Sequence, residues 1–118
     1  MDSQKSQLVE FPNDDLVSIA MCTYNGERYL AEQLDSIVNQ RYQNLEIVIV
    51  DDCSTDSTME ILRDYAQRDA RIRVLSNETN LGFVRNFERA ISECRGDLIA
   101  LADQDDVWFP EKIENLLE

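Results

Sequence analysis

Four short apolar runs recur along the chain, separated by longer stretches in which apolar and polar residues mix. The runs cover Leu16–Cys22, Leu45–Val50, Arg71–Ser76 and Asp97–Ala102. The first, second and fourth are nearly continuous, whereas the third alternates polar with apolar residues. Continuous apolar runs of this length are typical of strands that are buried on both faces, as in a parallel sheet. The pattern therefore predicts four strands in one mainly parallel sheet.

A helical spacing of apolar residues follows each predicted strand. The predicted helices cover Glu27–Gln40, Ser57–Arg68, Gly82–Cys94 and a last segment that begins at Pro110. Ser57 and Glu60 have the spacing of a capping box at the start of the second helix. Gly96 is expected to stop the third helix.

Strands and helices alternate from the first predicted element to the last. This alternation is typical of an α/β layered fold, in which helices flank a mainly parallel sheet. We expect residues 15–118 to form one such domain. Residues 1–14 are polar and aperiodic, and are predicted to form a flexible N-terminal tail.

Polar side chains gather immediately after each predicted strand. The four segments are Thr23–Glu27, Asp51–Asp56, Ser76–Gly82 and Asp103–Asp106. In open α/β sheets, ligands bind beyond the carboxyl ends of the strands. We expect the second and fourth strands to lie side by side and to run in the same direction. That arrangement would bring Asp52 and the acidic fourth segment to a common rim.

Each polar segment also has a purely structural interpretation. Thr23–Gly26 contains the Asn-Gly pair of a common turn, and Asp51–Asp56 could cap the next helix. Asn80–Gly82 could be a cap followed by a tight bend, and Trp108 with Phe109 could form a hydrophobic plug. The acidic segment could be a solvated turn. The convergence of four polar segments favours a ligand site over four unrelated turns.

The acidic segment, with Asp103, Asp105 and Asp106, points to a divalent cation. Two unit charges about 4 Å apart repel by about 4 kcal/mol at an effective dielectric of 20, so three carboxylates at a strand end call for a neutralising partner. Hard oxygen ligands suit magnesium, manganese or calcium. A calcium EF-hand is disfavoured, because Trp108 would occupy the loop position that needs glycine. A single Mg²⁺ or Mn²⁺ on one or two carboxylates, with sites open for phosphate oxygens, fits better.

Composition limits the classes of ligand. The chain has 24 Asp and Glu against 11 Lys and Arg, for a net charge of −13. It therefore has no electrostatic footprint for nucleic acid or for an anionic membrane. A bound cation would let such an acidic protein hold a polyphosphate ligand. The absence of histidine excludes His-based catalysis and His metal ligands, and neither the glycine-rich dinucleotide motif nor the P-loop motif is present.

The three cysteines, Cys22, Cys53 and Cys94, are far apart in the sequence. An odd count without close spacing gives neither a disulfide framework nor a zinc motif. Reduced thiols in a reducing, cytoplasmic compartment are expected. The first residues lack the pattern of a signal peptide, and no apolar segment is long enough to span a bilayer.

Taken together, the motifs resemble glycosyltransferase family 2, which has the GT-A fold. The opening of that family looks like VSIAMCTYNGERYLAEQLDSIVNQRYQNLEIVIVDDCSTDSTMEIL. Its continuation, with a D-x-D element, is similar to NLGFVRNFERAISECRGDLIALADQDDVWFPEKIENL. The resemblance covers about residues 16 to 118. It implies that residues 15–118 are the nucleotide-sugar (donor) binding part of a glycosyltransferase domain.

The resemblance also implies an activity and a setting. Family members of this kind move a sugar from a UDP- or dTDP-sugar to a saccharide or lipid-linked acceptor with inversion. Bacterial cell-surface polysaccharide synthesis, at the inner face of the membrane, is the implied setting. The DQDDVW form is similar to a bacterial subgroup of rhamnosyltransferases, so hexosyl or rhamnosyl transfer is expected.

The resemblance assigns a first group of residues to the nucleoside. Thr23, Tyr24 and Glu27 would line the base and ribose pocket, and Asn25 belongs to the same donor-binding group. Asp52 would accept a hydrogen bond from the ring N–H of uracil or thymine.

A second group is assigned to the ribose and the diphosphate. Asp103 would face the ribose, and Asp105 or Asp106 would hold Mg²⁺ or Mn²⁺. Arg85 or Asn86 would reach the phosphates. The catalytic base, a carboxylate in inverting members, is expected outside this chain, because family members are usually much longer.

Two other functions stay open at this stage. One is a nucleotide-sugar binding module that does not catalyse transfer. The other is a receiver-like phosphoacceptor domain, which also has a doubly wound sheet and an acidic Mg²⁺ pocket. Such a domain normally has its acidic pair after the first strand, where this chain has Thr23-Tyr24-Asn25.

Overall fold

The protein is built on a four-stranded parallel sheet. The computed structural model describes residues 15–118, so the predicted tail of residues 1–14 lies outside the described residues. The strands are β1 (Val17–Thr23), β2 (Leu45–Asp51), β3 (Ile72–Ser76) and β4 (Leu98–Ala102). Their order across the sheet is β3-β2-β1-β4, and each neighbouring pair is parallel. The predicted α/β architecture is confirmed, and each strand begins and ends within one residue of its predicted bounds.

The prediction that the second and fourth strands lie side by side is wrong, because β1 lies between them. They do run in the same direction. The register aligns Thr23 with Asp51 and Asp51 with Ser76, while Ala102 pairs with Met21. The carboxyl ends therefore form one edge. Neighbouring strands lie about 4.8 Å apart, so the ends of β2 and β4 are separated by about 10 Å.

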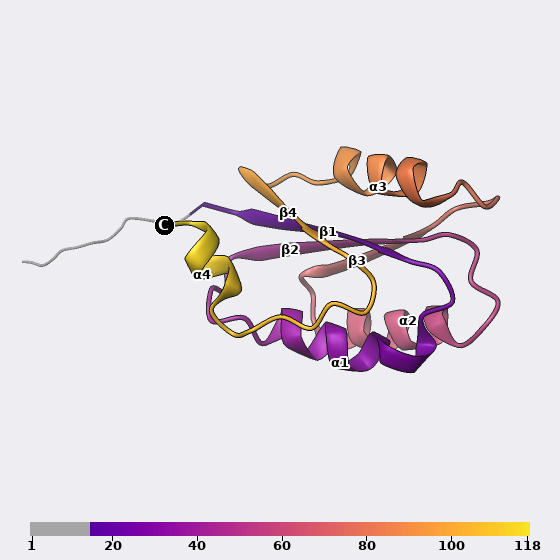
Figure 1. Ribbon diagram of the computed structural model, residues 1–118, viewed down its shortest axis with the longest axis horizontal. Helices are drawn as coiled ribbons and strands as arrows, with labels where there is room; N and C mark the ends of the chain where they lie inside the picture. The colour runs from indigo at the N-terminus through magenta and orange to yellow at the C-terminus, as the bar shows by residue number, and fades with distance from the viewer. Residues whose placement is uncertain (1–14) are drawn as a thin grey trace, which may run out of the picture.

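Helices cover both faces of the sheet (Figure 1). They are α1 (Glu27–Val38), α2 (Thr58–Arg68), α3 (Phe83–Ser92) and α4 (Lys112–Leu116). Helices α1 and α2 pack on one face over the larger hydrophobic core, while α3 lies on the other face over a smaller one. Strands β1 and β2 are buried along almost their whole length, as their continuous apolar runs predict.

The start of α2 differs from the predicted capping box. The Ser57 side chain makes no capping hydrogen bond. Instead the Thr58 N–H donates to Asp56 Oδ1 at 3.0 Å, and the Ser57 N–H donates to Glu27 Oε1 at 2.8 Å. The first turn of α1 therefore helps to cap α2, which ties together the segments that follow β1 and β2.

Gly96 does not stop the third helix. Helix α3 ends at Ser92, and Gly96 instead lies against the first residues of β1. A Cβ at position 96 would lie 2.6 Å from Ser18 Oγ and 2.7 Å from the Leu16 carbonyl oxygen. Glycine is required here because the backbone approaches β1 closely before β4 begins.

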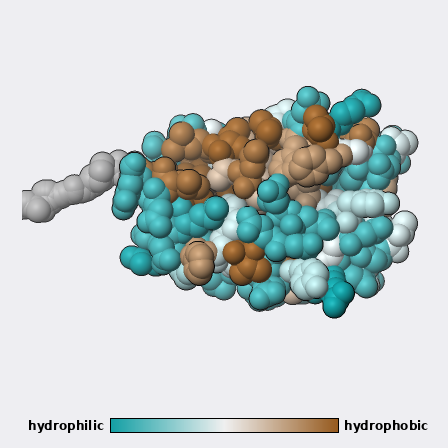
Figure 2. All heavy atoms as spheres, in the orientation of Figure 1, coloured by the Kyte–Doolittle hydropathy of each residue, from teal (hydrophilic) through white to brown (hydrophobic). Residues whose placement is uncertain are grey.

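Strand β4 is less buried than its apolar sequence predicts. Leu98, Ile99 and Leu101 keep 46%, 43% and 54% of their surface exposed, because β4 is an edge of the sheet within residues 15–118. Figure 2 shows hydrophobic side chains gathered on this side of the molecule, over β4 and α3. None of the described helices is long and apolar enough to cross a membrane.

Candidate functional site

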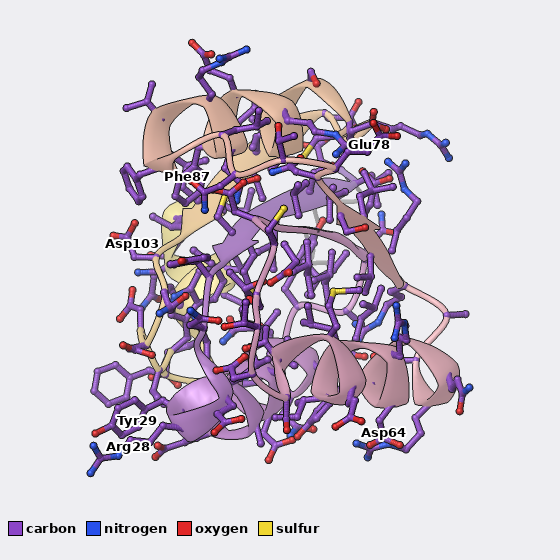
Figure 3. All side chains as sticks on the ribbon, turned by 90° about the vertical axis from the view of Figure 1, so that its right-hand side faces the viewer. Arg28, Tyr29, Asp64, Glu78, Phe87 and Asp103 are labelled. Atoms are coloured by element: carbon purple, nitrogen blue, oxygen red, sulfur yellow. The ribbon has the colours of Figure 1, made fainter. Side chains whose placement is uncertain are left out.

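A cavity of about 570 Å³ opens at the carboxyl edge of the sheet, next to α3. Its walls are formed by Cys22, Thr23, Tyr24, Asp52, Asn80, Gly82, Phe83, Asn86, Phe87 and Gln104. Figure 3 looks onto this edge and shows Asp103 between Phe87 on the α3 side and Tyr29 on the α1 side. The volume is in the range of pockets that hold small organic ligands. The three segments after β1, β2 and β3 and the acidic segment after β4 thus meet around one cavity.

Asp52 forms part of the cavity wall and is only 4% exposed. Its Oδ1 accepts hydrogen bonds from Asn77 Nδ2 at 2.7 Å and from the Leu81 N–H at 2.8 Å. Its Oδ2 accepts one from the Gly82 N–H at 2.9 Å. Burial by itself would raise the pKa of Asp52, but the hydrogen bonds from Leu81, Asn77 and Gly82 outweigh it and lower the pKa below its usual value. Asp52 is therefore an anion that lines the cavity, and its Oδ2 accepts one hydrogen bond from the described residues.

A buried network of side-chain amides holds Asp52 in position. Asn77 Nδ2 also donates to Asn86 Oδ1 at 2.7 Å, and Asn86 Nδ2 donates to the Val50 carbonyl at 3.0 Å. Arg89 Nη1 donates to Asn77 Oδ1 at 2.6 Å. Because these amides are satisfied by one another and by the backbone, the position of the Asp52 carboxylate is strongly constrained. Asn77 and Arg89 were not predicted, although Asn77 belongs to the polar segment after the third strand.

Aromatic rings form the α3 side of the cavity. Phe83 and Phe87 pack edge to face with their centroids 5.1 Å apart. Phe83 is 69% exposed and Tyr24 is 49% exposed, so both present ring surface to the opening. Flat apolar surfaces of this kind suit the face of a planar ligand ring. The two phenylalanines fall within the third predicted helix, and their spacing alone does not reveal a cavity.

Cys22 contributes a neutral thiol to the wall. Burial, together with the nearby negative charges of Asp52 and Asp103, raises the pKa of Cys22 from 9.0 to about 12. All three cysteines are unpaired, as predicted. The Cys22 thiol therefore acts as a small apolar surface at neutral pH and not as a nucleophile.

The segment after β1 divides into cavity residues and linking residues. Thr23 is buried in the cavity wall and donates to Asp51 Oδ1 at 2.6 Å. Asn25 and Glu27 do not line the cavity; Asn25 Oδ1 accepts the Thr55 N–H at 2.8 Å, and Glu27 caps α2 as described above. Asn25 also has a left-handed backbone, with φ of 49°. These two predicted donor-binding residues connect the segments that follow β1 and β2, and they do not line the cavity.

The acidic segment is a tight turn at the rim. The Asp106 N–H donates to the Asp103 carbonyl at 3.2 Å, and Asp105 between them has a left-handed φ of 70°. The side chains of all three aspartates are exposed, and Asp106 Oδ2 accepts Trp108 Nε1–H at 3.3 Å. Gln104, at the centre of the turn, lines the cavity and accepts the Tyr24 N–H at 2.8 Å through Oε1. Its Nε2 has no partner among residues 15–118, so it can donate to a ligand.

The donor set of the turn fits a hard divalent cation only in part. No group of three or more acidic, Cys or His side chains converges on a metal-sized site within the part of the chain that the structure describes. One or two carboxylates at the rim suit Mg²⁺ or Mn²⁺, which take most of their ligands from water and phosphate. A cation that shares its ligands between this turn and a bound diphosphate is compatible with the residues present, whereas an all-protein metal cage is not.

Two other residues named in the sequence analysis, Arg85 and Trp108, do not line the cavity. Arg85, on the first turn of α3, is exposed, does not line the cavity, and has no ion-pair partner among residues 15–118. Its neighbour Asn86 does line the cavity. Trp108 is buried, which agrees with the predicted hydrophobic plug, whereas Phe109 is 77% exposed and does not take part in it.

Comparison with known proteins places this architecture in a family. Residues 18–118 match the Glycosyl transferase family 2 profile. An uncharacterized glycosyltransferase of Haemophilus influenzae is 40% identical over 105 residues, which cover 89% of this chain and 32% of that protein. TuaG of Bacillus subtilis, a putative teichuronic acid biosynthesis glycosyltransferase, is 38% identical over 103 residues, or 87% of this chain and 41% of TuaG. The chain thus spans between about a third and two fifths of the length of these relatives.

Solved structures agree with the sequence matches. TarS 1–349 of Staphylococcus aureus, in complex with UDP-GlcNAc, superposes with a TM-score of 0.78 at 31% identity, covering 86% of this chain and 30% of that one. The mannosyltransferase PcManGT of Pyrobaculum calidifontis, in complex with GDP-Man and Mn²⁺, superposes with a TM-score of 0.81 at 26% identity, covering 87% and 31%.

These matches decide between the classes that the sequence left open. The receiver-like alternative is wrong, because the proteins that match over almost the whole described chain are glycosyltransferases. The parallel sheet with its flanking helices is the GT-A fold of those neighbours. The chain belongs to glycosyltransferase family 2.

Proposed function

We propose that residues 15–118 form the donor-binding part of an inverting glycosyltransferase that uses a UDP- or dTDP-sugar. The acceptor would be a saccharide or a lipid-linked saccharide, and the setting would be the synthesis of a bacterial cell-surface polysaccharide on the cytoplasmic side of the membrane. Relatives such as TuaG support this setting. Hexosyl or rhamnosyl transfer is the proposed reaction.

One observation carries the proposal: Asp52 and the acidic turn lie on the same edge of the sheet, with a cavity between them. The ends of β2 and β4 are about 10 Å apart across β1. A nucleoside can bridge such a distance with its base near β2 and its phosphates near β4. In the proposed arrangement the ligand would lie along the edge, with its base at Asp52 and its diphosphate at the acidic turn.

The base would be held by Asp52 and by the aromatic side of the cavity. Uracil and thymine each carry a ring N–H, which Asp52 Oδ2 can accept beside the Gly82 N–H. Phe83 and Tyr24 offer ring faces for stacking. Thr23 lies deep in the wall, while Asn25 and Glu27 would act by holding the β1 and β2 tips together.

The ribose and diphosphate would lie toward the acidic turn. Asp103 would face the ribose, and Asp105 or Asp106 would hold Mg²⁺ or Mn²⁺ against the phosphates. Such a cation would supply Lewis-acid stabilisation of the leaving diphosphate. Arg85, which has no ion-pair partner among the described residues, would reach the same phosphates. The base that takes the proton of the acceptor hydroxyl is not assigned to any residue of this chain.

Donor binding without transfer is the second candidate for this chain. It is favoured by one observation, namely that the chain spans only 32% of its Haemophilus influenzae relative. Assays of sugar transfer and of donor hydrolysis, made with this chain and with a longer version of the protein, distinguish the two. Transfer by the longer version alone would assign catalysis to the longer protein, and titration of this chain with nucleotide then tests binding by residues 15–118.

Calorimetric titration of UDP, dTDP and GDP, each with and without Mn²⁺, tests the donor site. We expect UDP or dTDP to bind only when Mn²⁺ is present, because the net charge of −13 repels a free diphosphate. GDP should bind more weakly, since guanine presents a different hydrogen-bonding edge to Asp52. Equal binding in the presence of a chelator would contradict the bridging cation.

Replacement of the turn carboxylates tests which of them holds the cation. Asp105→Asn or Asp106→Asn should weaken Mn²⁺-dependent UDP binding about tenfold or more, while leaving the melting temperature unchanged. Asparagine tolerates the left-handed backbone of position 105 and can still accept the Trp108 N–H at position 106. Glu60→Gln, an exposed carboxylate on α2, controls for the loss of one charge. If both turn variants bind like the parent protein, the metal assignment is wrong.

A further inference from the structure

The segment between β4 and α4 has almost no regular structure, yet its backbone is held in place by side chains of α1 and of the residues that follow it. Three polar residues, Gln33, Ser36 and Gln40, stand on one side of α1 and of the turn that follows it. The spacing of three residues places Gln33 and Ser36 on one face of α1. Gln40 lies just beyond the end of the helix at Val38. We call the three residues the α1 polar stripe. Gln33 and Gln40 are both fully buried, which is unusual for a glutamine side chain and calls for partners that satisfy both ends of each carboxamide.

Gln33 binds the acidic turn on both sides of Gln104. Its Nε2 donates to the Asp103 carbonyl, and its Oε1 accepts the Asp105 N–H at 3.3 Å. The carboxamide thus bridges two peptide groups of the turn. Asp105 has a left-handed φ of 70°, a conformation that costs a residue with a Cβ some free energy. The bond to Gln33 helps to hold that conformation, and so helps to set the direction in which the Asp105 carboxylate leaves the backbone.

The other two members of the stripe hold the segment farther along. Ser36 Oγ accepts the Trp108 N–H at 3.0 Å. Gln40 Nε2 donates to the Phe109 carbonyl at 2.7 Å, and Gln40 Oε1 accepts the Ile113 N–H at 3.0 Å. The stripe therefore follows the segment from the turn to the start of α4. Only Gln33 contacts the backbone of the turn itself.

We propose that Gln33 is a positioning residue for the diphosphate end of the donor, because its carboxamide fixes the peptide groups from which the turn carboxylates project. This inference rests on the proposed donor site. Gln33 is buried beneath the turn, so it acts through Asp103 and Asp105 and not by contact with the ligand. A merely structural glutamine would stabilise the fold without a specific effect on the metal-dependent part of binding.

The test compares Gln33→Met with two control variants of similar chemistry. Methionine keeps the length of the side chain and removes both hydrogen bonds. Gln40→Met makes the same change at the end of the stripe that does not touch the turn. Tyr65→Phe removes the hydroxyl that donates to Asp35 Oδ1 at 2.7 Å, which is a bond on another side of α1. Gln33→Asn, whose shorter side chain cannot span both peptide groups, replaces Gln33→Met if that variant does not fold.

Three quantities are measured for each variant: the melting temperature, the affinity for UDP with saturating Mn²⁺, and the hydrogen-exchange rate of the Asp105 amide. Loss of a residue that orients metal ligands typically lowers metal affinity by about 10- to 100-fold. We expect Gln33→Met to lose Mn²⁺-dependent UDP affinity by that factor and to exchange the Asp105 amide about tenfold faster or more. Gln40→Met and Tyr65→Phe should lower the melting temperature about as much as Gln33→Met does. Their affinity for UDP should change less than about threefold.

The outcomes separate this inference from the proposed function. If UDP affinity falls equally in all three variants, or does not fall in Gln33→Met, the positioning role of Gln33 is overturned. If the parent protein does not bind UDP with Mn²⁺, the proposed donor site fails, and exchange of the Asp105 amide decides the rest. In that case, an exchange rate raised only in Gln33→Met supports backbone positioning, and a rate that is unchanged or equally raised in Gln40→Met refutes it. The fluorescence of Trp108, the single tryptophan, reports independently whether the rest of the segment has moved.

Discussion

Asp52→Ala should lower the free energy of unfolding by about 3 kcal/mol and abolish nucleotide binding in the cavity. The substitution leaves the Leu81 and Gly82 N–H groups without their acceptor. Asn77 Nδ2 loses one of its two acceptors but keeps its bond to Asn86 Oδ1. The loop that leads into α3 would therefore detach from the sheet edge. Phe83 would move with this loop, so the cavity would lose one wall. Urea unfolding and calorimetric titration with UDP and Mn²⁺ measure the two effects.

Two further variants separate the hydrogen bonds of Asp52 from its charge. Asp52→Asn keeps the shape of the side chain but presents an NH₂ group to at least one N–H donor, so its stability should lie between that of the parent and that of Asp52→Ala. Glu78→Gln removes an exposed carboxylate on the neighbouring loop and should change neither stability nor binding. If Asp52→Ala unfolds at the same urea concentration as the parent, the loop is held by other contacts.

The same carboxylate gives stability a defined pH dependence. The folded-state pKa of Asp52 lies below its ordinary value of 3.8. Asp52 therefore contributes its stability fully above the unfolded-state pKa, and this contribution is lost as the pH falls through the lower folded-state pKa. The difference in unfolding free energy between the parent and Asp52→Asn should be constant near neutral pH and should shrink once the pH falls below 3.8. A difference that persists unchanged at the acidic end would show that the charge of Asp52 is not what stabilises the loop.

Gly96→Ala should lower the free energy of unfolding by about 2 to 3 kcal/mol. The added Cβ would lie 2.7 Å from the Leu16 carbonyl oxygen and 2.7 Å from the Ser18 backbone nitrogen. Neither atom belongs to a side chain that can rotate away. Relief therefore requires the start of β4 to move from β1, where the Gly96 and Asp97 N–H groups now donate to Ser18 Oγ and to the Leu16 carbonyl at 2.7 Å each. Urea unfolding measures the cost, and hydrogen exchange of the β4 amides shows where the structure opens.

Gly82→Ala is the matched comparison for this substitution. Gly82 has φ of 87° and ψ of 166°, a region that is essentially restricted to glycine, but no atom lies within 4 Å of the Cβ that alanine would add. The expected cost is the conformational strain of about 1 to 3 kcal/mol, without a packing clash. Gly96, unlike Gly82, does not have a positive φ, so backbone conformation does not require glycine at position 96. If Gly96→Ala unfolds like the parent protein, the close approach of β4 to β1 is not what requires glycine there.

Much of the fold follows from local patterns in the sequence. The pattern of apolar residues indicates how many faces of each element are buried. Examples are the continuous apolar runs of β1 and β2 and the helical spacing of Leu30, Leu34 and Ile37. Periodicity of this kind depends only on neighbouring residues, so element types and bounds could be read directly. The polar segments after the strands indicated the functional edge for a similar reason, because parallel strands end on the same side of a sheet.

Local patterns do not specify which elements become neighbours. The apolar run of β4 resembles those of the central strands. Only the strand order shows that β4 is an edge among residues 15–118 and that Leu98, Ile99 and Leu101 are exposed there. The same order places β1 between Asp52 and the acidic turn, which sets the width of the cavity. No sequence rule predicts the strand order, since several strand orders satisfy the same burial pattern.

The sequence by itself determined the α/β class, the bounds of the strands and the polar edge at which a ligand would bind. Only the tertiary structure decided that Asp52 holds the loop before α3, that Asn25 and Glu27 connect two strand tips, and that Gln33 supports a turn 70 residues away. The physical reason is that burial and periodicity act along the chain, whereas a hydrogen bond depends on the direction in which a side chain leaves its element and on what that element packs against.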